Sequence, residues 1–256
     1  LLQQEREIEA LKEYLLYNRY MLSSNNILLP KNESPVKFKN VLPIEGYFGQ
    51  LQSLAPHAYA IWRELLEVNQ KEYSNLPIDS CSVKGHPNAL LFKYFIRPYL
   101  QGNVLDIGCG PQPIPIYLED YSIKNIYGID PISNETDHPF NFVKGIGEFL
   151  PYEDEQFNVV IAATSLDHVL LLDRCFAEIS RVLRSGGYFA LWLQFVKNAP
   201  FYNPYREDIS QIDEFHLFHF GQDWFYKMIE NDFFVVEQYG YWSFTDPNFI
   251  LLKKKN

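Results

Sequence analysis

The chain has 256 residues, of which 47% are hydrophobic and 21% are charged, so it can bury one large α/β core but not two large domains. Its 22 Lys and Arg against 32 Asp and Glu give a net charge of −10, which argues against a surface for the phosphate backbone of nucleic acids. Cys81, Cys109 and Cys175 are widely spaced and form neither a disulfide framework nor a zinc motif, so we expect a reducing compartment.

The first 22 residues carry apolar side chains three and four positions apart with charges between them, as at Ile8, Leu11 and Leu15. This spacing predicts an amphipathic helix, which could pack on its own domain or pair with a second copy in a homodimer. No uncharged run approaches the roughly 20 residues of a membrane span. We therefore expect neither a signal peptide nor a membrane anchor, and a cytoplasmic protein.

Residues 23–45 are rich in Ser, Asn, Pro and Lys and predict a linker or an irregular lid. Two helices are expected near 53–70 and 86–100. We place a domain boundary after residue 80, with 1–80 as an N-terminal helical extension or lid beside the ligand site and 81–256 as the main domain.

From residue 103 onward, short apolar runs alternate with helical patterns, which is typical of a parallel sheet. We expect strands at 103–108, 126–130, 141–145, 157–163, 186–195, 233–242 and 248–254, and helices beginning at 114 and covering 170–184 and 222–231. The sequence therefore predicts an α/β, Rossmann-like, doubly wound seven-stranded sheet. The sheet should be mostly parallel, with an antiparallel last strand because a short turn joins the final two strands.

The segment "VLDIGCGPQPIP" at 104–115 places glycines after a strand, as in a nucleotide-binding turn. The prolines that follow lack the N–H groups that hold a pyrophosphate, and Asp106 would repel one, so the segment argues against NAD. A cationic cofactor without phosphate, such as S-adenosylmethionine, fits better. Asp130 ends the second strand, where its carboxylate could accept two hydrogen bonds from ribose hydroxyls or could simply cap the turn before Pro131.

Four motifs occur in order: "VLDIGCG", "YGID", "VKGIGEFLPYEDEQFNVVIAATSLDHV" and "EISRVLRSGGYFAL". On these motifs, residues 85–256 resemble the class I S-adenosylmethionine-dependent methyltransferases, of the small-molecule or glycan kind and type 11-like. The resemblance implies that Gly108, Gly110, Asp106 and Cys109 hold the methionine end. Asp130 would bind the ribose, Pro131, Ile132, Gly147 and Glu148 would surround the adenine, and Ala163 and Thr164 would form the floor. The chain departs from the family at Gln112, often Gly, and at Ile146, usually Asp.

Methyl transfer needs a group that removes a proton from the acceptor. His168 follows the fourth strand and is the expected general base, with Asp167 as the neighbouring candidate; the alternative for His168 is a helix-start residue in contact with backbone. His216 and His219 could hold or deprotonate an acceptor hydroxyl. They find no third ligand at helical spacing, so we expect no metal.

Twenty of the 42 aromatic residues lie between 188 and 249, which could form an acceptor pocket, a partner interface or simply core. The sequence thus predicts an O-methyltransferase acting on a small-molecule, sugar or lipid acceptor, with a small-molecule or glycan partner and neither nucleic acid nor membrane. The alternative is a catalytically inactive partner or scaffold subunit with the same fold. A nicotinamide-dependent short-chain reductase is a further rival, against which the sequence argues because no Tyr has Lys four positions later.

Overall fold

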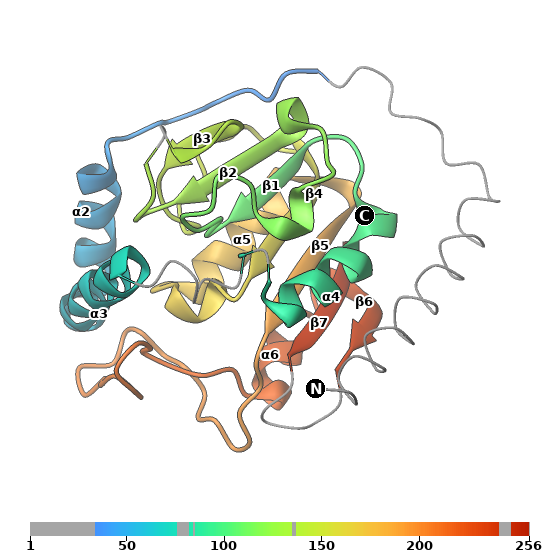
Figure 1. Ribbon diagram of the computed structural model, residues 1–256. Helices are drawn as coiled ribbons and strands as arrows, with labels where there is room; N and C mark the ends of the chain where they lie inside the picture. Colours follow the sequence, from blue (N-terminus) through green and yellow to red (C-terminus); the bar gives the residue numbers. More distant parts are fainter. Residues whose placement is uncertain (1–33, 76–81, 84, 135–136, 241–246, 256) are drawn as a thin grey trace.

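The computed structural model describes residues 34–75, 82–83, 85–134, 137–240 and 247–255. Seven strands form one sheet in the order β3-β2-β1-β4-β5-β7-β6 (Figure 1). Their bounds are β1 Val104–Ile107, β2 Ile126–Asp130, β3 Asn141–Lys144, β4 Phe157–Ala163, β5 Leu183–Leu193, β6 Phe233–Tyr239 and β7 Asn248–Lys254. Strands β1 to β5 pair in parallel, whereas β7 runs antiparallel to both β5 and β6. The predicted doubly wound sheet with an antiparallel last strand is confirmed.

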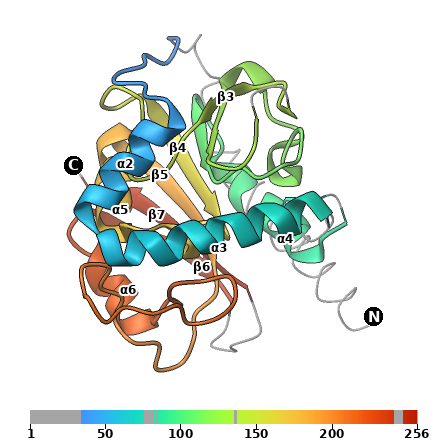
Figure 2. The same cartoon turned by 90° about the vertical axis from the view of Figure 1, so that its left-hand side faces the viewer.

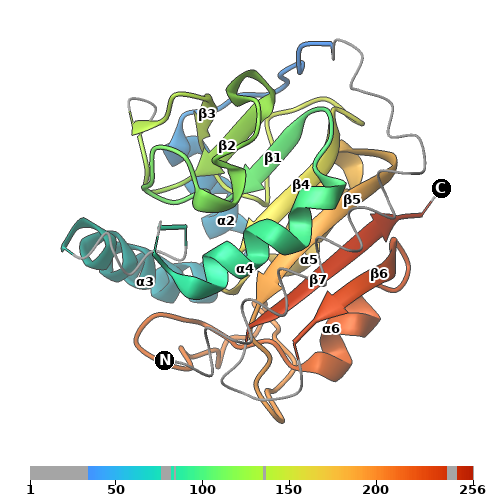
Figure 3. The same ribbon diagram turned by 45° about the vertical axis from the view of Figure 1, so that its right-hand side comes forward.

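The central strands are apolar on both sides because helices cover both faces of the sheet. All four residues of β1 are buried, and successive side chains enter opposite layers. Leu105 packs in the layer that contains α5 Leu172–Val182 and α6 Gln222–Ile229, while Val104 packs in the layer that contains α4 Pro87–Ile96. Figure 3 shows α4 crossing one face of the sheet with α5 behind it.

Two helices precede the main domain, α2 Ile44–Leu54 and α3 Pro56–Asn75. The helices expected near 53–70 and 86–100 are found as α3 and α4, but α2 was not anticipated. The break between α2 and α3 falls at Ala55, whose backbone (φ −142°, ψ 69°) leaves the helical region because a proline follows it. Leu51 and Trp62 bury their side chains in the same layer as α5, so the two helices share the hydrophobic core on this face of the sheet.

The prediction of a helix beginning at residue 114 is wrong. In its place the structure has one 3₁₀ turn, Ile116–Leu118. Pro111, Pro113 and Pro115 cannot donate helical hydrogen bonds, and each restricts the residue before it to extended conformations. The glycine turn therefore leads into a proline-rich loop instead of a helix N-terminus.

The predicted helix of residues 1–22, and the homodimer that it could mediate, lie outside the described residues. The proposed domain boundary at residue 80 also falls there, so it stays a prediction. Within the part of the chain that the structure describes, no helix is both long and apolar enough to cross a membrane.

Candidate functional site

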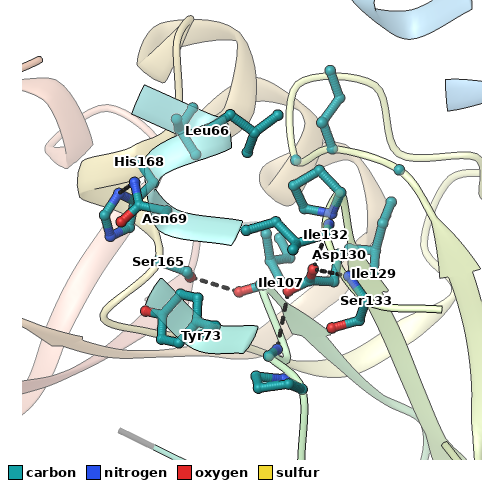
Figure 4. A pocket seen from close by; sticks show the side chains of 18 of the residues that line it. Leu66, Asn69, Tyr73, Ile107, Ile129, Asp130, Ile132, Ser133, Ser165 and His168 are labelled. Carbon is teal, nitrogen blue, oxygen red and sulfur yellow. Dashed lines mark hydrogen bonds between the residues drawn. The ribbon is translucent and has the colours of Figure 1, made fainter. Parts of the chain in front are cut away.

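A cavity of about 310 Å³ opens at the carboxyl ends of β1, β2 and β4, where ligands bind in folds of this type (Figure 4). Its walls come from the loops that follow β1, β2, β3 and β4. Helix α3 lies across the carboxyl ends of the strands and supplies a further wall, through Trp62, Leu66, Asn69, Gln70 and Tyr73 (Figure 2). The cavity thus joins the N-terminal helices to the sheet.

The glycine turn after β1 is closed by contacts to both neighbouring strands. Gly108 has φ +69°, and its N–H donates to the carbonyl of Ile129 at 2.8 Å. A Cβ atom at Gly108 would lie 2.4 Å from Cβ of Ser165, whose hydroxyl donates to the carbonyl of Ile107 at 2.6 Å. Only glycine fits this left-handed, crowded position.

Both glycine amides of the turn are already used by the protein. The N–H of Gly108 is bonded to Ile129, and the N–H of Gly110 donates to Oδ2 of Asp130 at 3.0 Å. The next residue, Pro111, has no N–H to offer. These two glycine amides are therefore not available to a phosphate, which favours a phosphate-free ligand.

Asp106 lies beneath the glycine turn and is fully buried. Its Oδ2 accepts a hydrogen bond from the hydroxyl of Tyr117 at 2.9 Å, whereas its Oδ1 has no partner among the described residues. Burial, together with the nearby Asp130 carboxylate, raises the pKa of Asp106 to about 7, although the Tyr117 bond opposes the shift. An unpaired buried acceptor of this kind suits a cationic ligand such as the methionine end of S-adenosylmethionine. Asp106 is not itself a wall of the cavity.

Asp130 lines the cavity and organises the end of β2 (Figure 4). Its Oδ1 accepts the N–H groups of Ile132 and Ser133, each at 2.8 Å, while Oδ2 accepts one recorded hydrogen bond from the described residues, that of the Gly110 N–H. A carboxylate oxygen can accept two hydrogen bonds, so Oδ2 keeps room for one ribose hydroxyl. The predicted turn role and the predicted ribose role are therefore compatible in one side chain.

The other candidate cofactor residues divide into those that reach the cavity and one that does not. Pro131, Ile132, Gly147, Glu148, Ala163 and Thr164 line it, whereas Cys109 is buried and does not. Ile146 adds an apolar wall where the family usually has Asp.

Glu148 has a structural duty besides its place in the wall. Its Oε1 accepts the N–H groups of Leu170 and Leu171 at 2.8 and 3.1 Å, next to the start of α5. Burial raises the pKa of this carboxyl, against the effect of those bonds and of Arg174. The carboxylate is thus committed to backbone amides, and its contact with an adenine stays a prediction.

The floor after β4 carries a strained residue. Thr164 has φ +54°, which is rare for a β-branched residue, and its N–H donates to the carbonyl of Trp192 at 2.8 Å. Such backbone strain persists where the surrounding structure enforces it and gathers at functional sites.

His168 is the one predicted catalytic residue that lines the cavity. Trp62 of α3 donates to its carbonyl at 2.7 Å, and the amide nitrogen of Asn69 lies 3.5 Å from its Nδ1. Burial lowers the pKa of His168, while Asp167 opposes and His216 reinforces that shift. The neutral imidazole that results is the form a general base requires.

The four predicted catalytic residues lie in one cluster, in which His168 lines the cavity and Asp167, His216 and His219 do not. The rings of His168 and His216 stack with centroids 4.7 Å apart, and Nε2 of His216 lies 3.8 Å from Oδ2 of Asp167. Nε2 of His219 lies 3.1 Å from Oδ2 of Asp213. The structure thus joins two sequence regions that spacing alone could not connect.

Sequence reasoning missed the walls that come from outside the motifs. These are the five α3 residues, Ser82, Tyr117, Ser133, Asn134 and Asp137. The α3 residues lie about 40 positions before the glycine turn, and their pattern is that of any amphipathic helix, so no local signal identifies them. Asp137, whose carboxylate accepts the N–H of Asn134 at 3.0 Å, belongs to a turn without a motif.

Comparison with known proteins agrees with the motifs. Residues 105–191 match a family model described as a methyltransferase domain. This segment runs from β1 into β5 and contains every wall residue of the cavity except those of α3 and Ser82.

Three curated relatives are similar to parts of the chain. Sterol 24-C-methyltransferase erg6 of Schizosaccharomyces pombe is 28% identical over 43% of this chain and 32% of its own length. The probable S-adenosylmethionine-dependent methyltransferase CRG1 of Saccharomyces cerevisiae is 35% identical over 35% of each chain. Mitochondrial arginine-hydroxylase NDUFAF5 of Homo sapiens is 33% identical over 33% of this chain and 26% of its own length. The chain thus spans about a third or less of the curated relatives it matches.

Among solved structures, the PH0226 protein from Pyrococcus horikoshii OT3 has the same fold. It superposes with a TM-score of 0.54 at 20% identity, covering 72% of this chain and 99% of that one. Together with the four motifs and the cavity, the family match identifies residues 105–191 as part of a methyltransferase domain of the class I, type 11 kind, for which S-adenosylmethionine is the cofactor.

Proposed function

We propose that the protein transfers a methyl group from S-adenosylmethionine to a hydroxyl of a small-molecule, sugar or lipid acceptor. The observation that carries this proposal is the cavity at the ends of β1, β2 and β4. The two glycine amides of its turn are bonded to the protein, and the turn stands above the Oδ1 atom of Asp106, which has no partner among the described residues. When bound, the cofactor supplies an electrophilic methyl group on a cationic sulfur.

The residues of the cavity then have separate tasks. Asp106 attracts the cationic end of the ligand from below the turn, and Oδ2 of Asp130 accepts a ribose hydroxyl. Ile132 and Ile146 offer apolar surface to the adenine. Helix α3 covers the cavity and keeps water from the reacting atoms.

His168 takes the proton from the acceptor hydroxyl. The contact between its Nδ1 and Asn69 is 3.5 Å, at the long limit of a hydrogen bond, so an acceptor hydroxyl can compete for that nitrogen. Asp167, His216 and His219 lie behind His168 and do not line the cavity, so in this proposal they set the charge around the base without touching the acceptor.

The acceptor class is the least constrained part of the proposal. The cavity walls toward α3 combine Trp62, Leu66 and Tyr73, which suit an apolar or ring-shaped molecule. One relative is named a sterol methyltransferase and another an arginine hydroxylase, so a panel of acceptors should include a sterol and an arginine-containing peptide beside phenols, sugars and lipid headgroups.

The first experiment is a calorimetric titration of the purified chain with S-adenosylmethionine and with S-adenosylhomocysteine. We expect micromolar binding of both, followed by transfer of a labelled methyl group to at least one acceptor of the panel. Binding without transfer to any acceptor favours the alternative, a catalytically inactive partner or scaffold subunit. If neither compound binds, the proposed function is wrong.

A further inference from the structure

Asp167, Asp213, His216 and His219 form a cluster beside His168, and the contacts that Asp213 makes in it have no part in the proposed methyl transfer. Asp213 lies in the loop between β5 and α6, and its Oδ1 accepts the N–H groups of Phe215 and His216, each at 2.8 Å. Those two bonds fix the carboxylate, and its Oδ2 turns toward two imidazoles. Nδ1 of His216 lies 2.9 Å from Oδ1 and 3.0 Å from Oδ2, and Nε2 of His219 lies 3.1 Å from Oδ2.

These three atoms have the spacing of a coordination sphere. The ligand atoms of Asp213, His216 and His219 all lie within 4.8 Å of one another. Imidazole nitrogen and carboxylate oxygen bind zinc-like ions at about 2.0–2.2 Å, which places adjacent ligand atoms roughly 3 Å apart. The two distances to Oδ2 match that value, and the two imidazole nitrogens lie within 4.8 Å of each other, so side-chain shifts would bring all three atoms to the spacing that an ion requires.

The other ring nitrogen of His216 meets a second carboxylate. Its Nε2 faces Oδ2 of Asp167 at 3.8 Å, and Oδ1 of Asp167 is buried without a hydrogen-bond partner among the described residues. A metal-bound imidazole commonly donates its other N–H to a carboxylate, which fixes the ring and increases its basicity. Asp167 is in place for that role once the gap closes by less than 1 Å.

The charge of the cluster also favours a cation. Two carboxylates flank one imidazole, and among the ion pairs recorded for the described residues neither Asp167 nor Asp213 meets a Lys or Arg. The ligand side chains keep between 20% and 37% of their surface exposed, so an ion can reach them from solvent.

We propose that Asp213, His216 and His219 bind one divalent transition-metal ion of the zinc type, with Asp167 as the positioning residue of His216. Three protein ligands leave at least one coordination position for water or another oxygen ligand. His168 stacks on His216 and lines the cofactor cavity, so the ion would fasten the loop to the wall of the cavity.

The test is a Co²⁺ titration of the chelator-treated full chain, followed by visible absorption and by competition with Zn²⁺. We expect one ion per chain, with binding weakened at least about tenfold in Asp213→Asn and in His219→Ala. His57→Ala is the matched control, because His57 is exposed on α3 and should leave binding unchanged. Circular dichroism checks that each variant is folded, and Asp213→Asn keeps the side-chain shape if the alanine variant does not fold.

The proposal is overturned if the wild-type chain binds neither ion stoichiometrically, or if His57→Ala weakens binding as much as the ligand variants do. The cluster would then be a hydrogen-bonded His–Asp network only. The titration contains no cofactor and no acceptor, so its failure leaves the proposed methyl transfer to be judged by its own binding experiment.

Discussion

Asp106 is a fully buried carboxyl, and burial raises its pKa in the folded protein. Because its pKa rises from 3.8 to about 7 in the folded protein, the folded chain keeps a proton that the unfolded chain has released over that interval. The free energy of unfolding should therefore fall as the pH rises from about 4 to about 7. In Asp106→Asn this loss should shrink, which urea denaturation below and above the pKa would measure. An equally steep pH dependence in the variant would contradict the shift.

The same residue should make cofactor binding pH-dependent. A cationic ligand prefers the ionised carboxylate, so the affinity for S-adenosylmethionine should increase as the pH rises through about 7. Asp106→Asn should bind more weakly and lose this dependence. Calorimetry across the pH range decides the point.

The Asp130 carboxylate accepts hydrogen bonds from the loops that follow β1 and β2, and its Oδ2 has the capacity for one more hydrogen bond. Asp130→Ala should weaken the binding of S-adenosylmethionine more than tenfold, as the loss of a charged contact and of the turn it supports implies. Glu207→Ala is the control, since Glu207 is exposed and is not one of the cavity walls. Unchanged affinity in Asp130→Ala would remove the ribose assignment.

His168 is proposed to act on the acceptor. His168→Ala should lower turnover by about 10² to 10⁴-fold while the dissociation constant of S-adenosylmethionine stays close to that of the wild type. Rapid-mix measurements of methyl transfer, paired with calorimetry, separate the two effects. Equal turnover in the variant would leave His168 a structural residue that contacts backbone, Asn69 and the ring of His216.

At the scale of elements, the turn at Gly108 and Gly110 connects the end of β1 to the end of β2 and lines the cavity. Gly108→Ala should destabilise the protein by about 1–3 kcal/mol, because it combines a left-handed backbone with a Cβ 2.4 Å from Ser165. Gly49 offers a matched control: it lies inside α2 with no atom within 4 Å of an added Cβ. Gly49→Ala should stabilise by about 0.5–1 kcal/mol. Denaturant unfolding of both variants should give opposite signs.

At the scale of the whole molecule, α3 connects the segment before the sheet to the cavity. It contributes walls to the cavity, and Asn69 donates to the carbonyl of Phe215 at 3.3 Å, so it also touches the loop of the histidine cluster. Saturating S-adenosylmethionine, at about 100 times its dissociation constant, should stabilise the fold by about 2.7 kcal/mol. Hydrogen exchange should slow more in α3 than in α4, which packs on the opposite face. Equal protection of both helices would contradict a specific role for α3.

The sequence by itself determined the sheet, the glycine turn and the cofactor class. Strand alternation and helix periodicity are local patterns, and Asp106, Gly108 and Asp130 stand at fixed offsets from strand ends, so their places follow once the strands are known. The prolines after Gly110 indicated a ligand without phosphate, because proline has no N–H to donate. The helix expected to begin at residue 114 was a wrong prediction.

Only the tertiary structure decided which distant residues meet. The cavity residues of α3 lie far along the chain from the motifs. Hydrophobic periodicity is the same for a helix that packs only in a core and for one that also lines a cavity, so the sequence pattern does not distinguish the two. Helical spacing identified no third ligand for His216 and His219, because their segment is a loop in which backbone amides aim the Asp213 carboxylate at both rings. Contacts made by loop closure depend on the packing of the whole chain, and local sequence does not encode that packing.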